Sequence, residues 1–152
     1  MTLSNSFGIS ATALTAQRLR MDIISSNIAN AGTTRASVVN GETVPYRRKM
    51  VVFSPNETNF SKMLQSQISG NPSKGIGAGV RVKSIEEDTA PLKPVYNPTH
   101  QDANAEGYVM MPNVDITKEM VDMISASRSY EANITALNAS KAMIMKALEI
   151  GR

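Results

Sequence analysis

The sequence predicts an α+β protein in which long N- and C-terminal helices pair as a coiled-coil-like unit and carry a small β-rich middle domain. Apolar residues recur at helical spacing at both ends of the 152-residue chain. All seven prolines and seven of the nine glycines lie between positions 32 and 112. Because Pro and Gly interrupt helices, we expect long helices only at the two ends.

The N-terminal helix is expected over residues 4–31, with no proline to interrupt it. Gly32 is expected to stop the helix in a left-handed conformation. One apolar residue recurs every seven positions, and a further one lies a turn away, which places them on one helix face. These residues are Phe7, Leu14, Met21 and Ile28, with Ile24 as the additional one.

The C-terminal helix is expected to begin near Asp115, with Asn113 or Asp115 as its N-cap, and to end at Gly151. Along one face of this helix, residues recur at steps of three or four positions; we call this row the seam, and eight of its ten positions are apolar. The seam contains Ile116, Met120, Met123, Ser127, Tyr130, Ile134, Leu137, Lys141, Ile144 and Leu148. Such a seam must be covered by the other terminal helix or by another chain.

Three domain segments follow: a helical core made of residues 1–32 and 113–152, and a β-rich middle over 33–112. Residues 44–53, 79–85 and 107–111 are the predicted strands, and 79–85 alternates apolar and polar side chains. The Asn-, Ser- and Gly-rich stretch 56–79 is expected to be a mobile loop with a helical turn or two.

Composition excludes several classes of protein. The absence of cysteine excludes disulfides and thiolate zinc sites. The net charge of +3 is mild, and the only basic run, Arg47-Arg48-Lys49, is expected to be a solvated strand end rather than a nucleic-acid patch. No apolar run is long enough to insert into a membrane, and the first residues do not have the pattern of a cleaved secretion signal.

No residue pattern predicts catalysis, a cofactor or a metal site. His100 has no second histidine and no cysteine to share a metal, and it lies in a turn-forming stretch. Gly75, Gly77 and Gly79 precede a strand, whereas a phosphate-binding loop precedes a helix. The acidic cluster at 86–88 is expected to be a solvated strand end. We therefore expect a protein that is not an enzyme.

From the pattern alone, two kinds of protein are equally consistent with the seams. Apolar contacts that repeat without closing build helical filaments, which favours a structural subunit. A self-paired helical hairpin that carries a β domain would instead be a monomeric or dimeric interaction module.

Particular residues favour the first alternative. The run from Ser26 to Thr34 resembles the signature of flagellar basal-body rod and hook proteins, and it closes the first helix as it does in that family. The motif residues are Ser26, Asn27, Ile28, Ala29, Asn30, Thr33 and Thr34. The stretches 95–100, 107–109, 112–115, 119–120 and 128–133 resemble the proximal-rod subtype. Tyr46-Arg47-Arg48 before an apolar strand is similar to the first β segment of the family.

The resemblance implies a structural subunit of the proximal rod that assembles helically around the export channel and transmits torque from the motor base to the hook. It implies as partners other copies of the chain, other rod proteins, the rod-to-base-ring adaptor and the flagellar type III export apparatus. It also implies a place in the basal body, in the periplasmic space, after export without a cleaved signal peptide. The remaining alternative is a dimerising helical-hairpin adaptor outside any filament.

The subunit interface is expected to consist of the apolar seam residues at both ends. These are Phe7, Leu14, Met21, Ile24, Ile28, Ile116, Met120, Met123, Tyr130, Ile134, Leu137, Ile144 and Leu148. Asn27 and Asn30 are expected to fix how the first helix joins the β region. No cofactor is expected.

Overall fold

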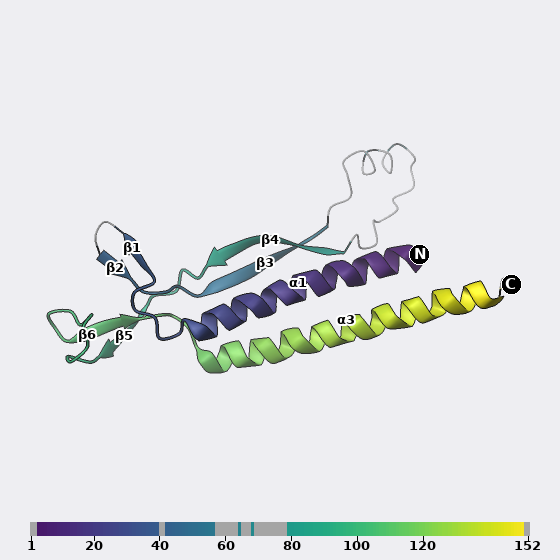
Figure 1. Cartoon of the computed structure of the whole chain (residues 1–152). Helices are drawn as coiled ribbons and strands as arrows, with labels where there is room; N and C mark the ends of the chain where they lie inside the picture. Colours follow the sequence, from purple (N-terminus) through teal and green to yellow (C-terminus); the bar gives the residue numbers. More distant parts are fainter. Residues whose placement is uncertain (1–2, 40–41, 57–63, 65–67, 69–78, 151–152) are drawn as a thin grey trace. The chain divides into compact units, whose positions relative to one another are not determined.

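The computed structural model describes residues 3–39, 42–56, 64, 68 and 79–150. Two long helices, α1 (Leu3–Ala29) and α3 (Ile116–Ile150), stand at the two ends of the sequence, with short strands between them (Figure 1). This arrangement confirms the predicted α+β class. The coiled-coil-like pairing of the helices and the three predicted domain segments remain predictions.

The chain divides into two compact units, and each unit takes segments from several parts of the sequence. The first contains Met1–Arg18, Val52–Ser84 and Ser127–Arg152, and the second contains Leu19–Val51 and Ile85–Ala126. The second unit therefore holds the C-terminal part of α1, the first turns of α3 and the start of β3. It also holds the buried polar residues Asn27 and Glu119.

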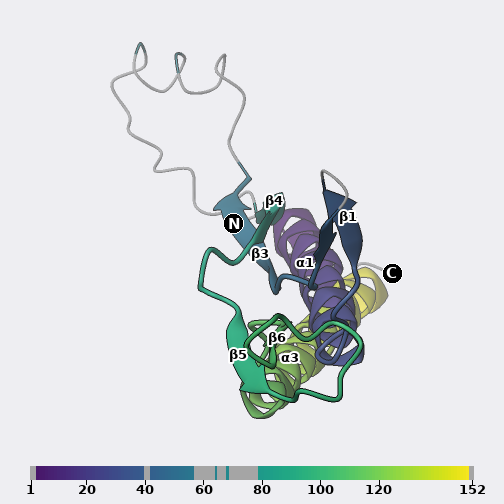
Figure 2. The ribbon, with the colours of Figure 1, turned by 90° about the vertical axis from the view of Figure 1, so that its left-hand side faces the viewer.

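The described strands form three separate two-stranded sheets (Figure 2). Strand β1 (Ser37–Val39) pairs antiparallel with β2 (Glu42–Val44). Strand β3 (Lys49–Pro55) pairs with β4 (Val80–Glu87). Strand β5 (Lys93–Tyr96) pairs antiparallel with β6 (Tyr108–Met111). A two-stranded sheet is marginal alone, so each depends on the residues packed around it.

The predicted strand over 44–53 is wrong as a single element, because the chain leaves β2 before it enters β3. Side chains distant in sequence take up the backbone donors where β3 begins. The N–H of Arg48 donates to Oδ1 of Asn113 at 2.8 Å, and the N–H of Lys49 donates to Oδ1 of Asn27 at 2.9 Å. These donors therefore do not belong to a continuous ladder from β2.

The other two predicted strands are present as β4 and β6. Strands β1 and β5 were not predicted, because they have three and four residues and β5 includes Pro94, which weakens a strand pattern. Most of the predicted loop over 56–79, with its helical turns, lies outside the described residues.

Helix α1 ends two residues before the predicted boundary, and its stop is not a left-handed glycine. Among the described residues, the glycines with positive φ are Gly79 (89°) and Gly107 (82°), so the expected role of Gly32 is wrong. Asn30 closes the helix instead, because its Nδ2 donates to the carbonyl oxygen of Ser26 at 2.9 Å. The same carbonyl also accepts the backbone N–H of Asn30 at 3.1 Å, so the side-chain amide adds a second hydrogen bond to the last turn of the helix.

Helix α3 begins after a single N-cap residue. Oδ1 of Asp115 accepts the backbone N–H groups of Thr117 at 3.0 Å and Lys118 at 3.3 Å. Of the two predicted candidates, Asp115 is therefore the N-cap. Asn113 instead joins separate segments, because its Nδ2 donates to the carbonyl of Ala90 while its Oδ1 accepts from Arg48. The predicted stop at Gly151 lies outside the described residues.

The core of the second unit mixes apolar with polar side chains. Asn27 and Glu119 are among its most buried residues, with exposed fractions of 1% and 0%. The buried apolar residues of this unit are Ile24, Tyr46, Val109, Pro112, Val114 and Ala126. Because a buried polar group must be hydrogen-bonded, the partners of Asn27 and Glu119 decide how this unit is held together.

Candidate functional site

Asn27 is the centre of a buried hydrogen-bond network in the second unit. Its Nδ2 donates to the carbonyl of Lys49 and to Oε2 of Glu119, each at 2.9 Å. Its Oδ1 accepts the hydroxyl of Tyr46 and the backbone N–H of Lys49, each also at 2.9 Å. Both ends of the amide are thus fully used, which explains why this polar side chain can be buried.

Glu119 brings the first turn of α3 into the same network. Its Oε2 accepts from Asn27, and its Oε1 accepts from Nε of Arg48 at 2.7 Å. Hydrogen bonds between charged groups are stronger than those between neutral groups. The fully buried carboxylate therefore has a cation on one oxygen and an amide donor on the other.

Arg48 connects this pair to further acidic groups. Its guanidinium nitrogens lie 3.7 Å from Oδ2 of Asp88 and 3.7 Å from Oδ2 of Asp122. Nη2 of Arg20 donates to the other oxygen of Asp122 at 3.2 Å. We call Asn27, Tyr46, Arg48, Glu119 and Asp122 the polar junction, because they join α1, the approach to β3, and α3.

One prediction from charge is wrong at the junction, and a second holds for only part of its cluster. Arg48 was expected at a solvated strand end, but its side chain is only 15% exposed and pairs with carboxylates. The acidic cluster at 86–88 was also expected to be solvated. Glu86 and Glu87 are exposed, as expected, whereas Asp88 lies near Arg48, and its backbone N–H donates to the carbonyl of Arg48 at 2.8 Å. Contacts between residues far apart in the sequence therefore partly bury Arg48 and Asp88, which the local charge pattern did not predict.

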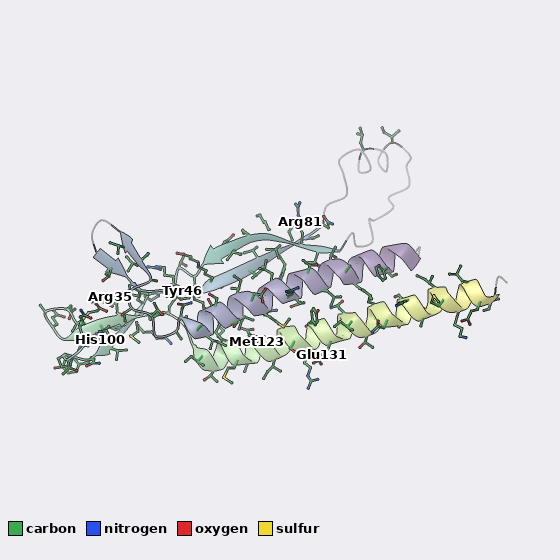
Figure 3. All side chains as sticks on the ribbon, in the orientation of Figure 1. Arg35, Tyr46, Arg81, His100, Met123 and Glu131 are labelled. Carbon is green, nitrogen blue, oxygen red and sulfur yellow. The ribbon has the colours of Figure 1, made fainter. Side chains whose placement is uncertain are left out.

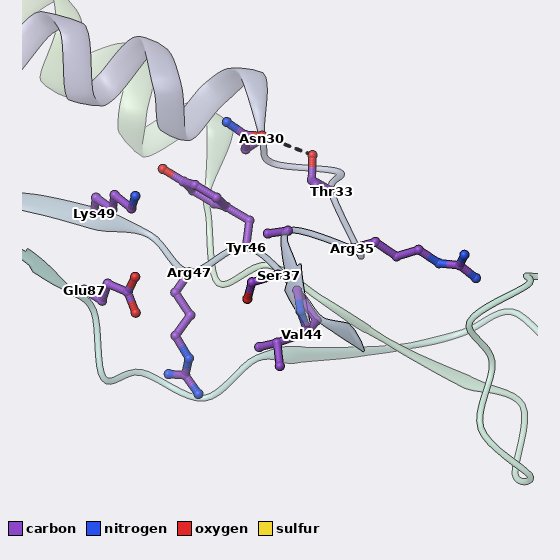
Figure 4. Close-up of a pocket in the computed structure, with 11 residues that line it drawn as sticks. Asn30, Thr33, Arg35, Ser37, Val44, Tyr46, Arg47, Lys49 and Glu87 are labelled. Atoms are coloured by element: carbon purple, nitrogen blue, oxygen red, sulfur yellow. Dashed lines mark hydrogen bonds between the residues drawn. The ribbon is translucent and has the colours of Figure 1, made fainter. Parts of the chain in front are cut away.

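The motif predicted from the sequence continues beyond Asn27. Ser26 Oγ lies 3.5 Å from the hydroxyl of Tyr46. Thr33 Oγ1 donates to Oδ1 of Asn30 at 3.3 Å, the bond drawn in Figure 4. Thr34 Oγ1 donates to Oδ2 of Asp102 at 2.8 Å. The polar motif residues thus connect the end of α1 to the segments that follow it.

Asp102 forms a second, more exposed polar cluster. Nε of Arg35 donates to its Oδ1 at 2.6 Å. Hydrogen bonds from Arg35, and to a lesser extent from Thr34, hold the pKa of Asp102 below its usual range. The hydrogen bond between Arg35 and Asp102 also raises the pKa of Arg35. His100 (Figure 3) accepts the backbone N–H of Asp102 on its Nδ1 at 3.1 Å, which is the structural turn role expected of it.

A pocket of about 560 Å³ lies beside the junction (Figure 4). It is lined by Tyr46, by the basic side chains of Arg35, Arg47 and Lys49, and by Glu87. Nζ of Lys49 lies 5.8 Å from the centre of the Tyr46 ring, within the range of a cation–π contact. The lining has no catalytic constellation, and the described residues contain no group of three or more side chains that could hold a metal ion.

The predicted interface residues fall into three groups by exposure. Ile24 is buried. The half-buried residues are Leu14, Met21, Ile28, Met123, Tyr130, Leu137 and Ile144. The exposed residues are Phe7, Ile116, Met120, Ile134 and Leu148. Exposed apolar residues are available to another chain, but their role as a subunit interface remains a prediction.

Helix α3 exposes an apolar row in the second unit that differs from the predicted seam by one residue. Ile116, Met120 and Ile124, which we call the exposed row, are 50%, 55% and 61% exposed. They are four residues apart and so lie along one face. The residues of α3 that are buried in this unit are Glu119 and Ala126. The predicted seam contains Met123 instead of Ile124, and the spacing of the apolar residues did not indicate that Glu119 is buried.

Among the described residues, no helix combines the length and the hydropathy that a membrane span requires.

Family models match both ends of the chain. Residues 7–36 match the model described as "Flagella basal body rod protein", and residues 105–150 match that described as "Flagellar basal body rod FlgEFG protein C-terminal". The first match contains the motif from Ser26 to Thr34, and the second contains Glu119 and the exposed row.

Full-length relatives are similar to the chain throughout. A protein of Bacillus subtilis named flagellar basal-body rod protein FlgC is 60% identical over 152 residues, the whole of both chains. The protein of the same name from Borreliella burgdorferi is 48% identical over 154 residues, covering 99% of this chain and 98% of the relative. That of Salmonella typhimurium is 44% identical over 152 residues, the whole of both.

Proposed function

The chain belongs to the FlgC family of flagellar basal-body rod proteins, and from this premise we propose that it assembles helically around the flagellar export channel. It is a structural subunit of the flagellar rod and not an enzyme. Membership of this family does not favour the alternative of a dimerising helical-hairpin adaptor.

The observation that supports assembly through α3 is the exposed row. Ile116, Met120 and Ile124 are each at least half exposed, although they are large apolar side chains. Burying such a side chain gains about 1.5–3 kcal/mol, so a row of three provides a substantial drive for association. In an assembled rod, the row would be covered by another rod subunit.

The polar junction supplies the stiffness that a subunit under torque requires. Arg48 and Glu119 are held by charge-assisted contacts, and Asn27 uses all of its hydrogen-bonding capacity. Moving α3 away from β3 would break several buried polar contacts together, which is costly. The junction would therefore carry force between the helices and the β region.

Location and partners follow from the family in the same proposal. The protein resides in the flagellar basal body and contacts other rod proteins. We place it in the periplasmic part of the basal body, after export by the type III apparatus without a cleaved signal. We add as contacts other copies of the chain, the rod-to-base-ring adaptor and, in transit, the export apparatus.

Basal bodies purified from cells that carry this chain with a small epitope test the proposal. We expect the tagged chain in the rod, and a deletion strain should yield basal bodies that lack a rod. A chain found as a free dimer, absent from basal bodies whose rods are intact, would contradict the proposal and support the adaptor.

A further inference from the structure

Two polar pairs join α1 and α3 in the second unit. Asn27 meets Glu119 at 2.9 Å, and Arg20 meets Asp122 at 3.2 Å. From the first pair to the second, the position on α1 falls from 27 to 20 while the position on α3 rises from 119 to 122, so these helix segments run antiparallel. Arg48 lies against both carboxylates, at 2.7 Å from Glu119 and 3.7 Å from Asp122.

The buried face of α3 has no large apolar side chain that would select one axial position. In this unit its buried residues are Glu119 and Ala126. Met123 is half-buried, and the large residues Met120 and Ile124 are exposed. A small or unbranched surface can slide along its partner with little loss of packing. Apolar packing alone therefore leaves the register of α3 weakly specified.

The polar contacts do distinguish the neighbouring registers. A shift of three residues would bring Asp122 to the place of Glu119, where its side chain is one methylene shorter and cannot span the same partners. A shift of four residues would bring Met123 there, and would leave the amide of Asn27 buried against a thioether. Buried donors without acceptors are strongly unfavourable, so both of these shifts are disfavoured relative to the observed register.

We propose that Arg48, Glu119 and Asn27 form a register lock that fixes the axial position of α3 against α1 in the second unit. Buried polar and ionic groups add little net stability, and their best-attested role is to specify register. Because Arg48 lies directly before β3, the lock also ties that register to the start of the strand. The proposal concerns the single chain and goes beyond rod assembly.

The chain has no cysteine, so two introduced cysteines can carry spin labels without interference. Ser25→Cys on α1 and Lys118→Cys on α3 are both exposed positions in the second unit. Pulsed electron spin resonance on this full-length chain should give one narrow distance peak. Adding Arg48→Met and Glu119→Leu should produce a second population, displaced along the axis by about 4.5–6 Å, the rise of three or four residues.

A matched control is the exposed pair Arg128 and Glu131, whose Nη1 and Oε2 atoms lie 3.0 Å apart. Arg128→Met with Glu131→Leu should leave the single peak unchanged. Circular dichroism reports whether each variant keeps its helices, because a lock can be lost while helix content is retained. Should the Arg48 and Glu119 double variant lose its helices, Glu119→Gln replaces it, with a second population again expected.

A single unshifted peak in the folded double variant, or in Glu119→Gln where that replaces it, would overturn the proposal. Several populations in the unaltered chain would overturn it equally, because the lock would then not set the register.

Discussion

Asn27 and Glu119 are 92 positions apart in the sequence, yet Nδ2 of Asn27 donates to Oε2 of Glu119 at 2.9 Å, and both residues are almost completely buried. Asn27 belongs to the motif that closes α1, and Glu119 belongs to the first turns of α3. The contact gives the motif a physical role beyond ending a helix, because it connects α1, the approach to β3 and α3 through one amide.

Replacing Asn27 with Ala should lower the free energy of unfolding by about 2–3 kcal/mol, because Tyr46, Lys49 and Glu119 all lose a buried partner. Urea denaturation followed by circular dichroism measures the change. Asn138→Ala, at an exposed position of α3, serves as the control and should change stability by less than about 0.5 kcal/mol. Equal effects of the two substitutions would show that the network does not stabilise the chain.

Asp102 should make folding sensitive to acid. Its pKa is lowered in the folded chain, chiefly by the hydrogen bond from Arg35 and next by that from Thr34. Its contribution to stability is therefore complete above the unfolded pKa of about 4 and is lost as the pH falls through the lower folded value. Asp102→Asn should flatten the fall in the thermal midpoint between pH 5 and pH 2. An unchanged slope in the variant would refute this role.

Two glycines should respond to alanine in opposite directions. Gly107 has a φ of 82°, and an added Cβ would lie 3.0 Å from Cε2 of Tyr96, so Gly107→Ala should destabilise the β5–β6 hairpin by about 1–2 kcal/mol. Gly8 lies inside α1 with nothing within 4 Å of an added Cβ, so Gly8→Ala should stabilise the helix by up to about 1 kcal/mol. Thermal unfolding of both variants compares them, and a destabilised Gly8→Ala would contradict the argument.

Asn30 should matter for assembly more than for production of the chain. Its Nδ2 caps the carbonyl of Ser26, and its Oδ1 accepts from Thr33, so it shapes the exit from α1. Asn30→Leu removes both contacts, and we expect normal cellular levels but no rod and no motility. Asn30→Asp, which keeps the acceptor and loses the donor, should be intermediate. Normal swimming of the Asn30→Leu strain would refute the prediction.

The sequence was informative where structure is local. Helical spacing predicted both long helices, and the proximity of Asp115 to the apolar row placed the start of α3 correctly. Local alternation likewise predicted β4, and an apolar run ended by Pro112 predicted β6. Each of these elements is determined by residues within a few positions of one another, and hydrophobic periodicity reports only on such local relationships.

The junction could be predicted only in part. The motif singled out Asn27, but of the other junction residues Arg48 was interpreted as part of a solvated strand end, and Glu119 was not predicted to be buried. Their pairing depends on how distant segments fold together, which no local pattern contains. The same limitation explains the split of the strand over 44–53, because Asn27 and Asn113 take up backbone donors in that stretch.

The central claim is that the exposed row of α3 is a contact between rod subunits, and one assembly measurement tests it. Met120→Lys with Ile124→Lys places charge on two exposed positions, so the isolated chain should keep its thermal midpoint. Met120→Leu with Ile124→Leu keeps the row apolar and serves as the control. We expect quantitative immunoblotting of purified basal bodies to find the leucine variant at the normal level and the lysine variant absent. Incorporation of the lysine variant at the normal level would contradict the claim.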